Sequence, residues 1–202
     1  MICAEDLVAV VLAAGNSTRM MCAKAVLPWR GSPLVCHQVR CYHDAGCATV
    51  IVVVGGAYET VVVQALGSTP GVVVVRNPDP SRGMLSSLRE GVQSGLEMGA
   101  KRVAFGPVDL PIADSVPIRE VLRAGRDTGY VVATYEAQRG HPALLSKGVA
   151  EAVCAASASA SARQLLSRFA CLEVPVTDPG VCGNLNTPAE LASWRDVQEG
   201  RI

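Results

Sequence analysis

Two cations and a run of small residues lie together near the start of the sequence, in an order that suits a polyphosphate. Ala13, Ala14 and Gly15 are the small residues, and Arg19 and Lys24 follow them. Small side chains let a ligand approach the backbone closely, and the N–H groups of such a loop can then face phosphate oxygens. The two cations add complementary charge. We therefore predict that this segment binds the phosphate groups of a ligand.

The loop follows an apolar run at residues 7–11 that is typical of a buried parallel strand. Open α/β sheets bind ligands beyond the carboxyl ends of their strands. Neither of the two common phosphate loops fits. A Walker A loop needs Gly before its lysine and Ser or Thr after it, whereas Lys24 lies between Ala23 and Ala25, and the dinucleotide fingerprint needs three glycines where Gly15 stands alone.

A carboxylate with the right position for a metal ion follows a second short apolar strand, predicted within residues 101–111. Asp109 lies near the carboxyl end of that strand and therefore at the predicted ligand crevice. A lone aspartate is what a magnesium ion requires when it shares the phosphates of a substrate. We predict that Asp109 binds Mg²⁺, and an ordinary turn aspartate is the alternative.

These segments resemble the molybdenum cofactor nucleotidyltransferase-like family. Its signature Leu-Ala-Ala-Gly-x-Ser-x-Arg-Met-Gly-x-x-Lys is matched by Leu12, Ala13, Ala14, Gly15, Ser17, Arg19, Met20 and Lys24. The family's glycine after Arg-Met is Met21 in this chain, which would be strained if that position needs a positive φ. Further matches are Asn77 with Gly83-Met84-Leu85-Ser86-Ser87-Leu88, Asp109-Leu110-Pro111, Gly140-His141-Pro142 and Asn184-Leu185-Asn186-Thr187-Pro188.

The resemblance implies a role for each of these segments. The implied catalytic residues are Arg19, Lys24 and Asp109. The implied nucleotide-binding residues are Leu12, Ala13, Ala14, Gly15, Ser17, Asn77, Gly83 and Ser87. Asn184 and Asn186 would bring oxygens to the Mg²⁺ on Asp109, with Thr187 capping a helix that starts at Pro188. Arg139 and His141 are candidates for holding an anionic acceptor, although His141 could equally be a structural residue before Pro142.

The implied activity is transfer of a nucleoside monophosphate from a nucleoside triphosphate to a phosphorylated acceptor, with release of pyrophosphate. The resemblance is greatest to cytidylyltransferases, so CTP is favoured as nucleotide, molybdopterin as acceptor and a molybdoenzyme as client. Relatives that use GTP tend to have Leu-Ala-Gly-Gly, and the extra methyl of Ala14 could crowd a purine. Three alternatives stay open: a sugar or alditol phosphate as acceptor, a non-catalytic nucleotide-binding maturation partner, and a cysteine-based metal or redox sensor.

Composition argues against several other classes of protein. The 202 residues carry no net charge and only 4% are aromatic, so no nucleic-acid footprint is present. The acidic amino terminus is not a signal peptide, and no apolar run reaches the ~18 residues that a membrane helix needs. We therefore expect a cytoplasmic protein without a membrane or nucleic-acid partner. Its eight cysteines contain no Cys-x-x-Cys, which favours reduced thiols in that compartment.

Strands and helices are predicted to alternate, which indicates an α/β fold with a mostly parallel sheet. We expect one nucleotidyltransferase domain over residues 1–202. The resemblance implies a three-layer, twisted sheet of the nucleotide-diphospho-sugar transferase type with a Rossmann-like nucleotide-binding half. Besides the two strands already described, strands are predicted at 49–54, 72–75 and 130–135, with an edge strand at 171–176. Helices are predicted at 34–45, 58–66, 84–96, 118–125, 149–156 and 162–169, and from Pro188 onward.

Overall fold

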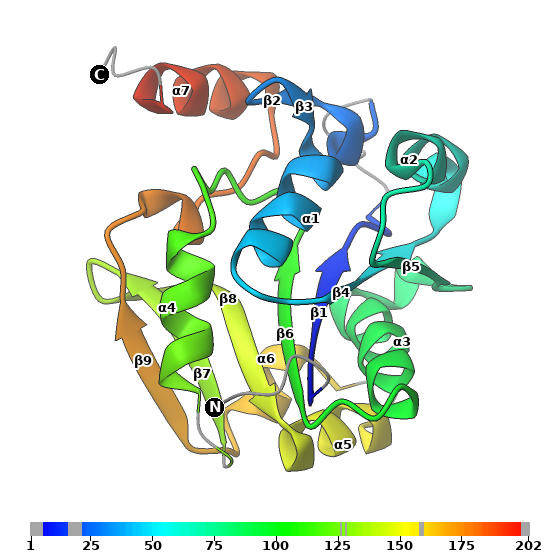
Figure 1. Cartoon of the computed structure of the whole chain (residues 1–202), viewed down its shortest axis with the longest axis vertical. Helices are drawn as coiled ribbons and strands as arrows, with labels where there is room; N and C mark the ends of the chain where they lie inside the picture. Colours follow the sequence, from blue (N-terminus) through cyan, green and yellow to red (C-terminus); the bar gives the residue numbers. More distant parts are fainter. Residues whose placement is uncertain (1–5, 16–21, 126, 128, 158–159, 199–202) are drawn as a thin grey trace.

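A twisted mixed sheet with helices on both faces forms the centre of the protein (Figure 1). The computed structural model describes residues 6–15, 22–125, 127, 129–157 and 160–198. Within these residues the sheet has seven strands, in the order β5-β4-β1-β6-β8-β7-β9. They are β1 (Leu7–Leu12), β4 (Thr49–Val54), β5 (Val72–Arg76), β6 (Arg102–Pro107), β7 (Tyr130–Tyr135), β8 (Gln138–Ser146) and β9 (Cys171–Pro175). A separate ribbon pairs β2 (Pro28–Trp29) with β3 (Ser32–Pro33).

Each face of the sheet has its own helices. One face is covered by α1 (Leu34–Asp44), α2 (Glu59–Leu66) and α4 (Val116–Ala124). The other is covered by α3 (Met84–Glu97), α5 (Lys147–Ala155) and α6 (Ala162–Leu166). The last helix, α7 (Pro188–Gln198), lies beside the β2–β3 ribbon in Figure 1, where Arg195 donates to the carbonyl of Pro28 at 2.8 Å. None of the described helices has the length and apolar character needed to cross a membrane.

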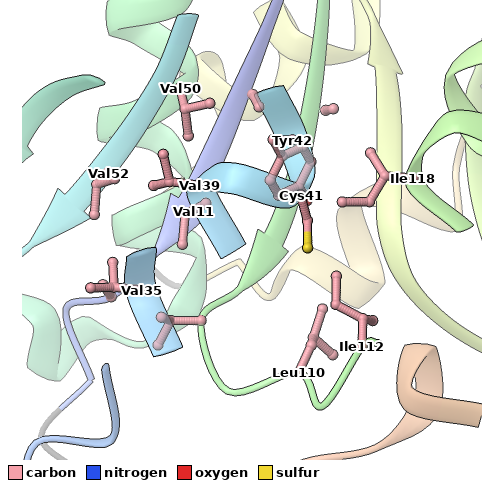
Figure 2. Close-up of a cluster of buried hydrophobic side chains, with 14 of the residues drawn as sticks. Val11, Val35, Val39, Cys41, Tyr42, Val50, Val52, Leu110, Ile112 and Ile118 are labelled. Atoms are coloured by element: carbon pink, nitrogen blue, oxygen red, sulfur yellow. The ribbon is translucent and has the colours of Figure 1, made fainter. Parts of the chain in front are cut away.

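Strand β1 shows why the central strands read as continuous apolar runs. Its alternate residues Ala9 and Val11 belong to the core under α1, whereas Val8 and Val10 belong to the core under α3. A parallel strand that is buried on both faces has no polar side to alternate with. Figure 2 shows Val11 of β1 among side chains of the first core, with Val35, Val39, Cys41 and Tyr42 from α1, Val50 and Val52 from β4, and Leu110, Ile112 and Ile118.

The predicted strands and helices are confirmed, and so is the mostly parallel sheet. β1 pairs in parallel with β4 and β6, β4 with β5, and β7 with β9 at the predicted edge. The sequence analysis missed β8, which runs antiparallel between β6 and β7. This strand contains Gly140 and Pro142, two residues that argue against a central strand. Its ladder with β6 begins only at Ala143, and its ladder with β7 is irregular around Pro142, so the proline interrupts few strand hydrogen bonds.

The strand order creates a crevice beyond the carboxyl ends of the neighbouring strands β1 and β6. The chain runs outward from β1 through β4 to β5 and then returns to the other side of β1 as β6. Loops that leave the carboxyl ends of β1 and β6 therefore diverge, and ligands bind at such a switch point. Helix α3 packs closely on β1 and β4, because a Cβ on Gly91 would lie only 2.4 Å from Cγ1 of Val10 and 2.9 Å from Cγ2 of Val53.

Candidate functional site

A cavity of about 690 Å³ opens at the carboxyl ends of β1 and β6. Its walls come from seven segments: the loop after β1, the 3-10 helix η2 (Lys24–Val26), the start of α2, the start of α3 with the turn before it, the loop after β6, the start of β8 and the loop before α7. The cavity brings together most of the residues predicted from the sequence, namely Leu12, Ala13, Ala14, Gly15, Lys24, Gly83, Ser87, Asp109, Arg139, His141, Asn184 and Asn186. Ser17 and Arg19 lie outside the described residues.

Lys24 joins the two main predicted metal ligands. Its Nζ donates to Oδ2 of Asp109 at 2.9 Å and to Oδ1 of Asn186 at 2.6 Å. The side chains of Lys24 and Asp109 are only 15% and 17% exposed, so water screens their attraction less than it would at the surface. Three segments that are far apart in the sequence thus meet at one point inside the cavity.

The oxygens of Asp109 and Asn186 fit a hard divalent cation. Both lie within hydrogen-bond distance of a single positive group, so they already converge on one cation. Magnesium prefers carboxylate and carbonyl oxygens and usually takes its remaining ligands from water or substrate phosphates. Asn184 lines the same cavity with an exposed side chain. The part of the chain that the structure describes contains no group of three or more His, Cys, Asp and Glu residues suited to a metal, so two protein oxygens plus phosphates are the arrangement that fits.

The loop that carries Asp109 is anchored by buried polar side chains that the sequence analysis did not identify. Nε2 of Gln38 on α1 donates to the carbonyl of Leu110 at 2.7 Å, and a ring nitrogen of His37 lies 3.0 Å from the carbonyl of Ile112. Both Leu110 and Ile112 also point into the core cluster of Figure 2. Buried polar groups need such partners, so α1 holds this loop by hydrogen bonds as well as by apolar packing.

The loop that carries Asn186 is held by a capping box at the start of α7. The backbone N–H of Glu190 donates to Oγ1 of Thr187 at 3.2 Å, as expected for the predicted helix cap. Oε2 of Glu190 accepts from Oγ1 of Thr187 at 3.1 Å and from the backbone N–H of Asn186 at 2.9 Å. The backbone N–H of Leu185 donates to the carbonyl of Asp109 at 3.0 Å and joins the loops that carry the two predicted metal ligands. The Thr-x-x-Glu spacing was a readable signal for Glu190, since it is the sequence signature of a capping box.

Replacing Glu190 by alanine is expected to loosen Asn186 without touching the cavity. The free energy of unfolding should fall by about 1 kcal/mol, because the carboxylate's hydrogen bonds with the N–H of Asn186 and the hydroxyl of Thr187 are lost. The metal concentration that gives half-maximal activity should rise several-fold, because the backbone of Asn186 loses its acceptor. Glu190→Gln keeps a side-chain oxygen and should restore most of both properties. Urea denaturation measures the unfolding free energy, and a metal titration of the activity measures the metal requirement. Glu151→Ala on the exposed face of α5 is the control. If both Glu190 variants behaved like the original chain, Glu190 would not hold Asn186 in place.

Asn77 lies beneath the cavity wall and holds two serines at the start of α3. It is buried, and its Nδ2 donates to Oγ of Ser86 and Oγ of Ser87, each at 2.9 Å. Its Oδ1 accepts from the backbone N–H of Asp79 at 3.0 Å. The structure places Ser87 on the cavity wall and Asn77 in the layer beneath it. Asn77 therefore orients a cavity-lining serine, where the sequence analysis predicted direct contact with the nucleotide.

Arg139 and His141 lie at the start of β8, on the wall that faces the loop after β6. Arg139 forms an exposed ion pair with Glu173 of β9, with Nη2 and Oε1 2.7 Å apart. The turn before it, Glu136-Ala137, has φ values of 47° and 62°, and two positive φ angles are typical of a tight two-residue hairpin turn. The hairpin thus presents a cation, already paired with a carboxylate, at the rim of the cavity.

His141 lines the cavity in its neutral form. Burial lowers its pKa from the usual 6.5 to about 4, although the negative charge of Asp109 acts in the opposite direction. Its ring lies edge-on to Phe105 with the ring centres 5.3 Å apart, and Nδ1 is buried without a hydrogen-bond partner among the described residues. At neutral pH His141 can therefore offer a hydrogen bond to an anionic ligand but no positive charge.

Two of the cysteines are buried and unreactive, and the described part of the chain holds no cluster of His, Cys, Asp and Glu residues suited to a metal. Cys41 and Cys47 are buried, and burial raises the pKa of each thiol to about 12. A thiol with so high a pKa is almost entirely protonated at neutral pH and is a poor nucleophile and a poor metal ligand. His37, which directly follows Cys36, is also packed in the core.

The chain is similar to known proteins over most of its length. Residues 9–173 match the family described as the MobA-like NTP transferase domain. A curated relative, the molybdenum cofactor guanylyltransferase of Xanthomonas euvesicatoria pv. vesicatoria (strain 85-10), is 28% identical over 188 residues, which cover 90% of each chain.

Solved structures of the same fold come from several organisms. Rv0371c of Mycobacterium tuberculosis H37Rv is 25% identical with a TM-score of 0.76, and the match covers 96% of this chain and 98% of that one. Rv0371c has also been crystallised in complex with manganese, at 22% identity, a TM-score of 0.71 and coverage of 94% and 97%. A nucleotidyl transferase from Methanothermobacter is 21% identical with a TM-score of 0.81 and coverage of 97% and 99%. Because the family match spans most of the sequence, this chain belongs to the MobA-like NTP transferase family.

Proposed function

We propose that this protein transfers a nucleoside monophosphate from a nucleoside triphosphate to a phosphorylated acceptor and releases pyrophosphate. The observation that carries the proposal is the meeting of Lys24, Asp109 and Asn186 in a cavity lined by the backbone of residues 12–15. A cation, a carboxylate and a neutral oxygen donor beside a small-residue loop suit a triphosphate with its metal ion. Membership of a nucleotidyltransferase family supports the same reaction class.

In this reaction a phosphate oxygen of the acceptor attacks the α-phosphorus of the nucleotide, and pyrophosphate leaves. The protein contributes alignment and charge neutralisation and needs no covalent nucleophile. Lys24 and Arg19 stabilise the triphosphate and the leaving pyrophosphate. The backbone of residues 12–15 faces the phosphates, and Gly83 and Ser87 at the start of α3 contact the nucleoside. Mg²⁺ held by Asp109 and Asn186, with Asn184 beside them, supplies charge neutralisation on the phosphate oxygens when it is bound.

On the acceptor side, the proposed residues are Arg139 and His141. Arg139 offers a guanidinium to an anionic group, and the neutral imidazole of His141 offers a hydrogen bond. We propose molybdopterin as the acceptor, and the name of the curated relative supports a molybdenum cofactor intermediate. A sugar or alditol phosphate is the competing class, because a guanidinium recognises the phosphate that both classes share.

The test is pyrophosphate release with Mg²⁺, each of CTP, GTP, ATP and UTP, and molybdopterin as acceptor. We expect release that depends on the acceptor, the nucleotide and the metal. A parallel reaction with sugar and alditol phosphates distinguishes the two acceptor classes. Nucleotide binding without pyrophosphate release from any acceptor would contradict the proposal and would favour a nucleotide-binding maturation partner for a molybdoenzyme, with Met21→Gly as the next variant to examine.

We further propose that CTP is the preferred nucleotide, and Ala14 gives the matched test. Ala14 lines the cavity at the end of β1 but is only 2% exposed, because its methyl packs into the core on the α3 side. Its Cβ lies 3.5 Å from the position that a Cβ on Gly55 would occupy, so the methyl of Ala14 fills the space between the loop after β1 and Gly55 at the end of β4. Removing it gives the loop room to move away from a larger base.

Ala14→Gly is therefore expected to raise the ratio of kcat/KM for GTP to that for CTP by about tenfold, the usual value of one methyl-sized difference in a binding pocket. Steady-state pyrophosphate release with both nucleotides measures the ratio, and Ala13→Gly, one residue earlier in the same loop, is the control. An unchanged ratio in Ala14→Gly would remove Ala14 as a determinant, and a preference of the original chain for GTP would overturn the choice of CTP.

A further inference from the structure

Lys24 occupies the point at which the two proposed metal ligands converge. Its Nζ lies 2.9 Å from Oδ2 of Asp109 and 2.6 Å from Oδ1 of Asn186, so one ammonium group takes both oxygens. A magnesium ion bound to the same two oxygens would sit about 2.0–2.1 Å from each of them. Such an ion would overlap the position of the ammonium group.

The ammonium and a divalent ion therefore exclude each other at this point. Like charges a few ångströms apart repel strongly where water is scarce, and the Lys24 side chain is only 15% exposed. The geometry leaves Asp109 and Asn186 one cation at a time. A free divalent ion must displace Lys24 before it can bind, and that displacement weakens its affinity.

A nucleoside triphosphate provides a second place for the ammonium group. Lys24 begins the short helix η2, whose backbone is fixed by the bond from the N–H of Leu27 to the carbonyl of Lys24 at 3.0 Å. The charge stands on a flexible four-carbon stem, so Nζ can move while the backbone stays. The cavity wall formed by residues 12–15 adjoins Lys24, and triphosphate oxygens bound there would attract its charge away from Asp109.

We propose that Lys24 acts as an internal cation that competes with the divalent metal for Asp109 and Asn186, so that the metal binds tightly only together with a nucleoside triphosphate. Only the part of this inference that involves a nucleoside triphosphate rests on the proposed function. Competition between Lys24 and the metal is a property of the protein without any substrate. The coupling is reciprocal, so metal and triphosphate each strengthen the binding of the other.

The experiment measures Mn²⁺ binding to the full chain without nucleotide, by electron paramagnetic resonance of the free ion. Mn²⁺ is expected to bind Lys24→Met at least about tenfold more tightly than the original chain, because a competing charge has been removed. The gain should vanish in Lys24→Met/Asp109→Asn. Lys101→Met is the matched control, since Lys101 is 67% exposed and pairs with Asp6 away from the cavity. Equal or weaker Mn²⁺ binding by Lys24→Met would overturn the proposal.

Thermal unfolding gives an independent readout, because a ligand that binds the folded state raises its Tm. Mn²⁺ should raise the Tm of Lys24→Met more than that of the original chain. Lys24→Gln serves the same comparison if Lys24→Met does not fold, because glutamine is polar but carries no charge. If Mn²⁺ raised the Tm of the folded variant no more than that of the original chain, competition between Lys24 and the metal would be contradicted.

A third arm uses the original chain and a CTP analogue with a methylene bridge between the α- and β-phosphates. Mn²⁺ should bind the protein–analogue complex at least about tenfold more tightly than it binds protein or analogue alone. If Lys24→Met gains affinity but neither this analogue nor the matching analogues of GTP, ATP and UTP bind, competition stands and the nucleotidyl transfer proposal falls. If pyrophosphate release proceeds and Lys24→Met gains nothing, the competition falls and the transfer proposal stands.

Discussion

Asp109→Asn is expected to lower the rate of pyrophosphate release by about 10²–10³-fold, the range found when one electrostatic contact to the transition state is removed. Asp109 is the only proposed metal ligand with a negative charge, and its Oδ2 also holds Lys24 at 2.9 Å. An asparagine of the same shape retains an oxygen but neutralises the charge that attracts both cations. The loss should appear in kcat, because the charge acts on phosphates whose own charge redistributes during the reaction.

The measurement is steady-state pyrophosphate release at saturating Mg²⁺ and nucleotide, together with urea denaturation to verify folding. Asp44→Asn is the control, because Asp44 ends α1 at the surface and does not line the cavity. A rate for Asp109→Asn within a few-fold of the original chain would show that Asp109 is not a metal ligand in the reaction. A large loss in Asp44→Asn would instead point to a general effect on the fold.

Lowering the pH from 7 to 4 is expected to cost this protein about 3 kcal/mol of unfolding free energy through His141 alone, at about 1.4 kcal/mol per unit of pKa shift. Burial lowers the pKa of His141 from 6.5 to about 4. Between these two values the unfolded chain binds a proton on this residue and the folded chain does not. The folded state therefore loses stability as the pH falls through this window, and the loss is complete once the pH passes below about 4.

Urea denaturation of the original chain and of His141→Gln at several pH values between 4 and 7 measures this contribution. The variant should lose about 3 kcal/mol less than the original chain over that range, since glutamine does not titrate. Burial also lowers the pKa of His37, but His37 is present in both chains and cancels in the difference. Parallel pH profiles for the two chains would show that folding does not lower the pKa of His141.

The sequence predicted that residues 12–15 and Asp109 lie together at one edge of the sheet, and the structure places all of them on the cavity wall. Residues 12–15 and Asp109 each follow an apolar run that forms a parallel strand, and the carboxyl ends of parallel strands meet at one edge of a sheet. Apolar patterning therefore fixes both where these residues fall in the fold and that they lie together. The capping box at Thr187 was equally local, because a helix start is determined by a few neighbouring residues.

What the sequence did not predict depends on contacts between distant segments. Nothing local marks Gln38 as the anchor of the Asp109 loop, since the two are joined only when α1 packs on the sheet. The position of Asn77 beneath Ser87, and not on the cavity wall, follows from how α3 docks. The neutral state of His141 follows from burial, which a sequence pattern does not give. Strand β8 was hidden because Gly140 and Pro142 break the expected apolar alternation.

The β7–β8 hairpin separates the two halves of the site in evolutionary terms. In the proposed reaction the first residues of β8, which follow the tight turn at Glu136-Ala137, form the acceptor wall of the cavity, whereas the nucleotide wall comes from β1, α3 and β6. Hairpin turns at the surface tolerate substitution and changes of length better than buried parallel strands do. Under the proposed function, selection could therefore alter the residues around Arg139 and recruit a new phosphorylated acceptor while the nucleotide chemistry remains unchanged.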